Sequence, residues 1–306
     1  MTQVHPPAAS VEYVPKLAAF GVLFASVCFG LVPFFSRGLM EAGLAPQAVA
    51  FYRYFIAAIL LSPVLIQQRH AWREVLWGLS AGAVMGLGWI GYVIALETVP
   101  VSTVGVLYMT YPVFTVVLAW LLFADRPSRK AVAAAALIIL AAVIAGNPAA
   151  VPAEQIPVLV MSLAAPFGFG FGICVLVHRL ARIPPLARIA AVSLGSMLAL
   201  LPLVLTSERS AIIPEDNAVW LLISGIAIFS ALIPQLVYTI CSPMVGTSRT
   251  AVIGSVELPT MFALGVFAYG EALTLPQAIA CVLILSAILI TRSRKVRSVT
   301  TNISKQ

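Results

Sequence analysis

Charged residues are scarce in this sequence. Asp, Glu, Lys and Arg make up 9% of the 306 residues, whereas 61% are hydrophobic. Soluble domains carry about 25% charged residues, so this composition excludes a water-soluble globule. A membrane-spanning helix needs about 20 apolar residues, and stretches of that length without any charge occur at 17–36, 75–96, 131–153 and 272–291. The sequence therefore predicts an all-α integral membrane protein.

Motifs for nucleotide, cofactor and metal binding are also missing. There is no GxxxxGK[ST] loop, so ATP does not drive this protein directly. No lysine lies within a predicted span, which excludes a retinal Schiff base. The four cysteines form no CxxC pair and lie in apolar stretches, as small core residues do; they are Cys28, Cys174, Cys241 and Cys281. We expect no metal site and no cofactor.

Two patterns match enzyme motifs but lack the remainder of the site. The sequence "GLSAG", Gly78–Gly82, fits GxSxG, but a serine nucleophile needs a base, and the three histidines lie at loops or helix ends. The sequence "GLGWIG", Gly86–Gly91, fits GxGxxG but lies inside an apolar run instead of after a strand. The GxxxG spacing of these glycines, repeated at Gly168 and Gly172, suits close helix packing in lipid. We therefore expect no enzyme.

The basic residues are distributed unevenly between alternate loops. We predict ten spans, at 17–36, 46–66, 75–96, 101–123, 131–147, 156–177, 187–206, 217–240, 248–269 and 273–291. Fifteen of the 18 Lys and Arg residues then fall on one side of the membrane, and only Arg37, Arg53 and Arg209 fall on the other. Cytoplasmic loops are enriched in Lys and Arg, so both termini are predicted to be cytoplasmic. Basic residues in short loops between spans also argue against a nucleic-acid partner, despite the net charge of +7.

The second half of the sequence repeats features of the first. The run "YPVFTVVLAWLLFADRPS" aligns with "LPTMFALGVFAYGEALT", so that Pro112 matches Pro259 and each apolar run ends in an acid, Asp125 or Glu271. Because each half has five spans, an odd number, the two copies are predicted to be inverted. Inverted repeats are typical of secondary transporters, with the substrate site at the repeat interface near mid-membrane. The predicted repeats are residues 17–147 and 155–292.

These features resemble the drug/metabolite transporter superfamily, and specifically its EamA-type ten-helix transporters. The matching stretches are "AVAFYRYFIAAILL", "YPVF" and "GTSRTAVIGSVELPTMFALGVFAYGEALT". The resemblance covers about residues 17 to 292. It implies export or exchange of small metabolites, including amino acids, across a bacterial inner membrane. One departure is Asp125, which stands where the second repeat has "GE".

Several aromatic side chains and one arginine lie deep in predicted spans. Trp89 and Tyr92 are three residues apart on one helix face, as are Tyr108 and Tyr111. A buried polar group in lipid needs a partner, so these groups either bond neighbouring helices or line a cavity. Arg53 lies about a turn into the second span, where it either snorkels to the interface or faces the cavity. The resemblance favours a cavity for all five.

Glu257 and Pro259 are the most unusual pair in the sequence. A charged side chain at the centre of a span costs about 2.5–3.5 kcal/mol on insertion scales, so it usually faces protein or water. Proline removes a backbone donor and frees a carbonyl one turn back, so Pro112 and Pro259 are predicted hinges. The alignment puts Thr110 opposite Glu257. Glu257 is expected to bind a cationic group or carry a proton; the alternative is a structural bond, through Ser255 or Arg249.

Together these features predict a secondary transporter that exports or exchanges a small organic metabolite by alternating access. Its other partner would be membrane lipid, and coupling to protons or to solute exchange stays open, as does the oligomeric state. The alternatives are a membrane-embedded lipid-modifying enzyme, which lacks a nucleophile–base pair here, and a non-transporting membrane scaffold.

The predicted topology can be tested by labelling single cysteines in a cysteine-free background. A cysteine at Glu154, in the loop between the fifth and sixth spans, should react only from outside the cell. A cysteine at His70 should react only from the cytoplasm, because its loop carries Arg69 and Arg73. Reaction of the Glu154 position only from the cytoplasm would contradict the topology.

Overall fold

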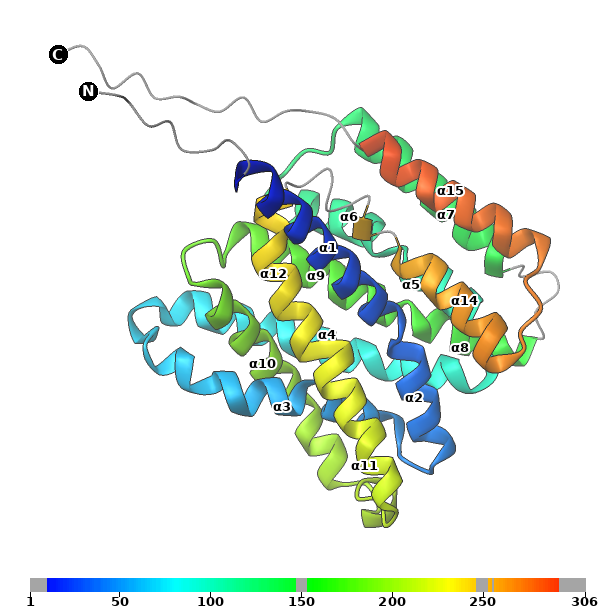
Figure 1. Cartoon of the computed structure of the whole chain (residues 1–306), viewed down its shortest axis with the longest axis horizontal. Coiled ribbons are helices and arrows are strands. Elements are labelled where there is room, and N and C mark those ends of the chain that lie inside the picture. The colour runs from blue at the N-terminus through cyan, green and yellow to red at the C-terminus, as the bar shows by residue number, and fades with distance from the viewer. Residues whose placement is uncertain (1–9, 147–152, 246–252, 255, 292–306) are drawn as a thin grey trace.

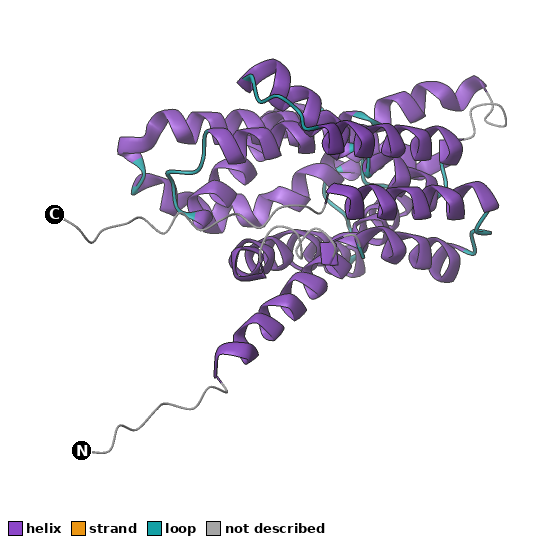
Figure 2. Cartoon of the chain, turned by 90° about the horizontal axis from the view of Figure 1, so that it is seen from above, coloured by secondary structure: helices purple, strands orange, loops and turns teal. Residues whose placement is uncertain are grey.

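The computed structural model describes residues 10–146, 153–245, 253–254 and 256–291 of the chain. In these ranges every regular element is a helix, and short loops join the helices (Figure 2). The prediction of an all-α protein is therefore confirmed.

The helices follow one another in the order of the predicted spans. The first half contains α1 (Ser10–Gly30), α2 (Val32–Glu41), α3 (Pro46–Ile66), α4 (Trp72–Thr98), α5 (Val101–Tyr108), α6 (Tyr111–Phe123) and α7 (Arg129–Gly146). The second half contains α8 (Ile156–Ser162), α9 (Ala164–His178), α10 (Pro185–Leu205), α11 (Asn217–Ser224), the π-helix η4 (Gly225–Leu232), α12 (Ile233–Val245), α14 (Glu257–Tyr269) and α15 (Leu275–Thr291). Short 3₁₀ helices lie at Arg69–Ala71, Ala153–Gln155 and Arg209–Ala211.

Seven helical segments of the described chain are long and apolar enough to cross a membrane. They are Lys16–Glu41, Pro46–Ile66, Arg69–Thr98, Val101–Phe123, Ile156–His178, Pro185–Leu205 and Asn217–Ser242. The chain is therefore a multi-pass integral membrane protein. The helices α7, α14 and α15 are not among the seven, so the count of ten spans stays a prediction, as does the inverted orientation of the halves.

Helix breaks occur at matching places in the two halves. The first segment of each half is interrupted, at Leu31 between α1 and α2 and at Leu163 between α8 and α9. The fourth segment of the first half is broken at Met109–Thr110, between α5 and α6, and α14 likewise begins directly after a turn at Val256. A proline follows each break within a few residues, where a helix start tolerates its missing N–H.

The ends of α6 and α14 show how the halves correspond residue by residue. Both helices have 13 residues, and each ends at a residue in the left-handed conformation, Ala124 (φ 53°) or Gly270 (φ 63°). In each case the next N–H donates to the carbonyl six residues back, Asp125 N to Ala119 O (3.1 Å) and Glu271 N to Gly265 O (2.9 Å). These matching caps are Schellman-type closures.

This correspondence corrects the alignment made on the prolines. The equivalent positions lie 146 residues apart, so the counterpart of Glu257 is Tyr111 and not Thr110. Pro112 is the second residue of α6 and Pro259 the third residue of α14, so the prolines are one position out of register. The two halves therefore place different groups at the same structural position: a phenol in one and a carboxylate in the other.

Glycines let α4 approach its neighbours closely on two sides. A Cβ added at Gly82 would overlap the carbonyl oxygen of Val192 on α10, and one at Gly91 would overlap that of Met161 on α8. The Ser196 hydroxyl donates to the Gly82 carbonyl at 2.7 Å, which ties α10 to α4. Figure 1 shows α3, α4 and α10 on one side of the molecule and α7 beside α15 on the other. The glycine-rich stretch of the third span is thus a packing surface, as its spacing predicts.

Substitution of Gly82 by alanine should destabilise the protein, because α4 and α10 must separate to admit the methyl group. Overpacking of this kind costs about 1–3 kcal/mol of unfolding free energy. Gly38→Ala is the matched control, since a Cβ there would meet only the Leu222 side chain, at 3.4 Å. The substitution also removes the backbone-entropy cost of a glycine in a helix. Thermal unfolding in detergent should show a lower midpoint for Gly82→Ala and no loss for Gly38→Ala. Equal midpoints would refute the close contact.

Candidate functional site

Arg53 lies inside the helix bundle, on α3. This helix starts at Pro46 after the extended Ala45, which places Arg53 about two turns from the helix start. The residue is 8% exposed, and its Cζ lies 3.9 Å from the centroid of the Trp89 ring. A cation over a tryptophan face contributes about 2 kcal/mol when desolvated. The guanidinium therefore faces the protein interior instead of snorkelling to the interface. Its Nη1 atom has no hydrogen-bond partner in the part of the chain that the structure describes.

Aromatic rings from four helices surround this guanidinium site. Trp89 and Tyr92 of α4 have ring centroids 4.7 Å apart, and both rings contact Tyr108 of α5, at 5.5 Å and 5.7 Å. Tyr108 in turn contacts Tyr111 of α6 at 5.9 Å, and Phe169 of α9 lies against both tyrosines, at 5.8 Å and 4.9 Å. The structure thus brings together all four aromatic residues singled out in the sequence.

Two hydroxyl groups of this cluster differ in their bonding. The hydroxyl of Tyr92 is buried and has no hydrogen-bond partner among the residues that the structure describes, and the residue itself is 0% exposed. An unsatisfied buried polar group costs about 1–3 kcal/mol. Tyr54, next to Arg53 on α3, is also buried, and its hydroxyl lies near Trp89 and Ser196. Tyr92 and Arg53 therefore both have bonding capacity that the described protein atoms leave unused.

Glu257 is the first residue of α14 and lies within electrostatic reach of this cluster. Its carboxylate interacts with Arg53 and with the phenols of Tyr92, Tyr108 and Tyr111. The residue keeps partial exposure although it lies among these buried groups. No salt bridge joins it to Arg53 among the described residues. The alternative partners Ser255 and Arg249 lie outside the described residues.

The helix start favours a negative charge at Glu257. The first N–H groups of a helix are unpaired and carry partial positive charge, which stabilises a carboxylate in the first turn. Arg53 adds a second positive group nearby. The site therefore holds a guanidinium on α3 and a carboxyl group on α14, and no ion pair joins the two among the described residues.

Three contributors to the site escaped the sequence analysis. Tyr54 stands in "FYRYF" beside Arg53, Phe169 in "GFGFG", and Tyr238 alone in α12. Tyr238 lies within electrostatic reach of Glu257 and packs edge-on against Phe29, with ring centroids 6.0 Å apart. The rule used for Trp89 and Tyr92, that polar aromatic groups deep in a span need partners, applies equally to Tyr54 and Tyr238.

The two predicted hinge prolines lie in the first turns of α6 and α14. Neither interrupts a continuous helix; each follows a break that already exists, so its missing N–H leaves no gap in a ladder. Tyr108 ends α5 before the first break, Tyr111 begins α6 after it, and Glu257 begins α14 after the second. Each break thus carries site residues, and the hinge role of Pro112 and Pro259 stays a prediction.

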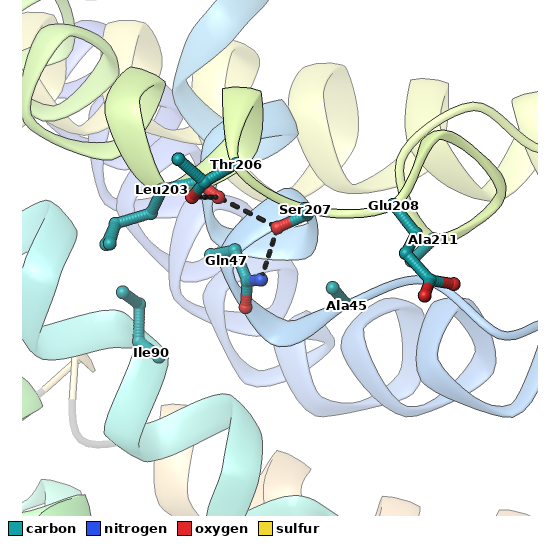
Figure 3. Close-up of a pocket in the computed structure, with 8 residues that line it drawn as sticks. All are labelled: Ala45, Gln47, Ile90, Leu203, Thr206, Ser207, Glu208 and Ala211. Carbon is teal, nitrogen blue, oxygen red and sulfur yellow. Dashed lines mark hydrogen bonds between the residues drawn. The ribbon is translucent and has the colours of Figure 1, made fainter.

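A separate pocket of about 580 Å³ opens between the start of α3 and the end of α10. Figure 3 shows Gln47 bonded to Ser207 across it, with the Gln47 amide nitrogen donating at 2.6 Å. The other lining residues are Ala45, Ile90, Leu203, Thr206, Glu208 and Ala211. None of the predicted site residues lines this pocket, so it is distinct from the Arg53–Glu257 site.

Comparison with known proteins gives one family. The model of the EamA-like transporter family matches the chain twice, over residues 16–146 and 156–293. Sixteen chains of solved structures match as well. One, titled only "Crystal structure of protein", has a TM-score of 0.60 and 18% identity, and the match covers 90% of this chain and 96% of that one. This likeness concerns the fold alone. No curated protein matches the chain.

Replacement of Trp89 by leucine tests whether this cluster recognises a solute. Leucine keeps apolar bulk but removes the ring face under Arg53, so we expect the preference among transported solutes to change more than the amount of folded protein. The measurements are relative uptake rates for a panel of solutes and the yield of monodisperse protein. Parallel loss of folded protein and of all transport would instead show that Trp89 serves core packing.

Proposed function

The chain belongs to the EamA-like transporter family, and on this premise we propose that it is a secondary transporter of small organic solutes that carry both an ammonium and a carboxylate, such as amino acids. Family membership makes the protein a membrane transporter of small solutes. The solute class, export or exchange as its direction, and alternating access as its mechanism are our proposals. So are its location in a bacterial inner membrane and the cytoplasmic position of both termini.

The observation that carries the proposal is the unused bonding capacity of Arg53 and Tyr92. The Nη1 atom of Arg53 and the hydroxyl of Tyr92 are both buried, and neither has a hydrogen-bond partner within the described ranges of the chain. Both groups donate hydrogen bonds, and a carboxylate accepts several at once. Hydrogen bonds to a charged group are worth about 1.5–3 kcal/mol each. A solute carboxylate between them would accept a hydrogen bond from each group, so that the free-energy cost of the two unsatisfied donors would be recovered on binding.

Glu257 is proposed to bind the ammonium group of the same solute. It lies within electrostatic reach of Arg53, and no salt bridge joins the two among the described residues. We therefore propose that each group binds a solute that lies between them. An ammonium group at Glu257 would restore the neutrality that hydrocarbon surroundings favour. A solute with both charges therefore compensates the two buried side chains together.

The aromatic rings fit the remaining part of such a solute. Trp89, Tyr108, Tyr111 and Phe169 form a continuous set of ring contacts with centroid distances between 4.9 Å and 5.9 Å. Ring faces accept apolar groups, other rings and cations. We therefore infer a preference for amino acids with apolar or aromatic side chains over small polar ones.

The position of the site supports alternating access. Tyr108 and Tyr111 flank the α5–α6 break, and Glu257 directly follows the break before α14. Rotation of a half-helix at either break would therefore move a site residue relative to Arg53 and Trp89, which lie on the unbroken helices α3 and α4. Broken helices at mid-membrane that bind the solute are a recurring feature of secondary transporters.

Solute counterflow in proteoliposomes tests the function. Vesicles loaded with an unlabelled amino acid should take up the labelled form transiently against its gradient. Analogues that lack the carboxylate or the ammonium should compete poorly. Absence of counterflow for every zwitterion in a broad panel, with correctly folded protein, would contradict the proposal.

Glu257→Gln keeps the shape of the side chain and removes its charge. It should yield normal amounts of folded protein yet bind zwitterions roughly tenfold or more weakly, because one charge-assisted contact is lost. Net transport or its pH dependence should be lost as well. Glu97→Gln, an exposed acid of α4, is the matched control and should behave as the unmodified protein. Unchanged transport by Glu257→Gln between pH 5 and 8 would leave Glu257 with a packing role only.

A further inference from the structure

Glu271 joins the two halves of the protein at one end of the bundle. It follows α14 in the second half and accepts hydrogen bonds from the first turn of α5 in the first half. Val101 N–H donates to its Oε1 at 2.7 Å, and both the N–H and the hydroxyl of Ser102 donate to Oε2, at 3.3 Å and 3.1 Å. Pro100, the residue before α5, provides no side-chain cap. The carboxylate of Glu271 therefore caps α5 from the other half, where the helix dipole favours negative charge.

Arg37 of α2 completes this contact. Its Nη1 lies 3.7 Å from Glu271 Oε1, and its guanidinium lies 4.4 Å from the ring centroid of Tyr269. The Glu271 side chain is only 13% exposed, so the pair is shielded more than an ordinary surface salt bridge. Arg37 also contacts Glu41 at 3.6 Å, but that side chain is 66% exposed.

A further bond between the halves lies beside Glu271. The amide nitrogen of Gln277, in the first turn of α15, donates to the Thr103 hydroxyl of α5 at 3.1 Å, and both residues are buried. The start of α5 is thus held by Glu271 and Gln277 together. We call Arg37, Val101, Ser102 and Glu271 the clasp.

The equivalent acid at the other end of the bundle is bound differently. Asp125 follows the same helix closure as Glu271 in the first half, but its side chain is 63% exposed. Its partner is His178 of α9, at 3.7 Å from Nε2, and that ring stacks on Phe123 with centroids 4.5 Å apart. An exposed pair of this kind contributes little. Among the described residues, the acid at the Glu271 end is a shielded tie between the halves, whereas the corresponding acid at the other end forms only an exposed pair.

We propose that the clasp is the latch of the outer gate, and that Glu271 is a positioning residue that keeps this gate shut until solute or proton binding elsewhere releases it. The outer end is the one that the distribution of basic residues places opposite the cytoplasm. The inference rests on the proposed transport function, because a gate matters only if the halves move. The charge on Glu271 strengthens the latch, because the Arg37 contact needs an anion and because both carboxylate oxygens accept hydrogen bonds from α5.

Loss of that charge should shift the protein toward an outward-open arrangement. In Glu271→Gln the amide keeps one acceptor oxygen, but its NH₂ group faces donors of α5 and the attraction to Arg37 disappears. Two effects should follow together: the outer end opens more often, and the cytoplasmic end opens less often, because alternating access couples them. A purely structural role would loosen the outer end without protecting the inner one.

Single-cysteine reporters in a chain without Cys28, Cys174, Cys241 and Cys281 measure both ends. Val104→Cys, on α5 beneath the clasp, is 0% exposed and reports the outer end with a membrane-impermeant maleimide in whole cells. Gly254→Cys reports the inner end in inverted vesicles. A Cβ at this position fits, because it would lie 3.7 Å from the Tyr238 hydroxyl and 3.9 Å from the Ser26 hydroxyl. Glu271→Gln should raise labelling at Val104→Cys about tenfold and lower it at Gly254→Cys.

Glu41→Gln is the matched control, because it removes the other acid beside Arg37 and leaves the α5 cap intact. Glu41→Gln should leave the labelling rates of both reporter cysteines unchanged. Should Glu271→Gln fail to fold, Arg37→Gln leaves the α5 cap in place and removes the ion pair with Glu271, together with the contacts to Glu41 and the Tyr269 ring. It should show the same two changes in smaller measure. Unchanged labelling at both reporters in a folded clasp variant, or faster labelling at both, would overturn the latch.

The readout separates the latch from the transport proposal, since labelling needs no solute. Opposite changes at the two ends without counterflow of any zwitterion would uphold the latch and refute the proposed solute class. Zwitterion counterflow by the unmodified protein, with unchanged labelling in Glu271→Gln, would uphold the proposed solute class and refute the latch.

Discussion

The cost of burying opposite charges in a hydrocarbon environment is the constraint on which this structure depends. Arg53 and Glu257 come from different halves and lie among aromatic rings. Burial of either charge alone would cost free energy. A direct ion pair between them would offset the cost of both charges without any solute. The structure instead compensates them partially, through the Trp89 ring face at Arg53 and the α14 helix start at Glu257. The remaining cost is what a solute with two charges can relieve.

On the proposed alternating-access mechanism, one wall of the site stays rigid and the other adjusts. The rigid wall is the α3–α4–α10 group, in which Gly82 and Gly195 admit backbone contacts closer than any Cβ would allow. It holds Arg53, Trp89 and Tyr92. The adjustable wall consists of the broken segments, which hold Tyr108, Tyr111 and Glu257. Under that mechanism, Arg53 would stay fixed on one side of the site while Glu257 on the other side changed its distance from it.

The sequence predicted much of this arrangement, for identifiable reasons. Composition alone required transmembrane helices, and the requirement that buried polar groups find partners singled out Arg53, Trp89, Tyr92 and Glu257. Phe169 was missed because it carries no polar group and because the rotation of a helix about its axis depends on neighbouring helices, which periodicity in a uniformly apolar span does not reveal. Tyr54 was missed although the partner requirement for buried polar groups applied to it as well. The proline alignment was one residue out, because the helix closures at Ala124 and Gly270, and not the prolines, fix the correspondence. The contact between Asp125 and His178 could not be predicted from the sequence either, because the two residues are 53 positions apart and only the fold brings them together.

The central claim is that Arg53 and Glu257 read the two charges of one solute separately, and competition by single-charge analogues measures this most directly. The affinities of a zwitterion, its decarboxylated amine and its deaminated acid would be compared in Arg53→Gln and in Glu257→Gln. The account predicts that Glu257→Gln loses the preference for the zwitterion over the acid, whereas Arg53→Gln loses the preference over the amine. If both variants kept the preferences of the unmodified protein, the two charges would not be reading the solute, and the account would be wrong.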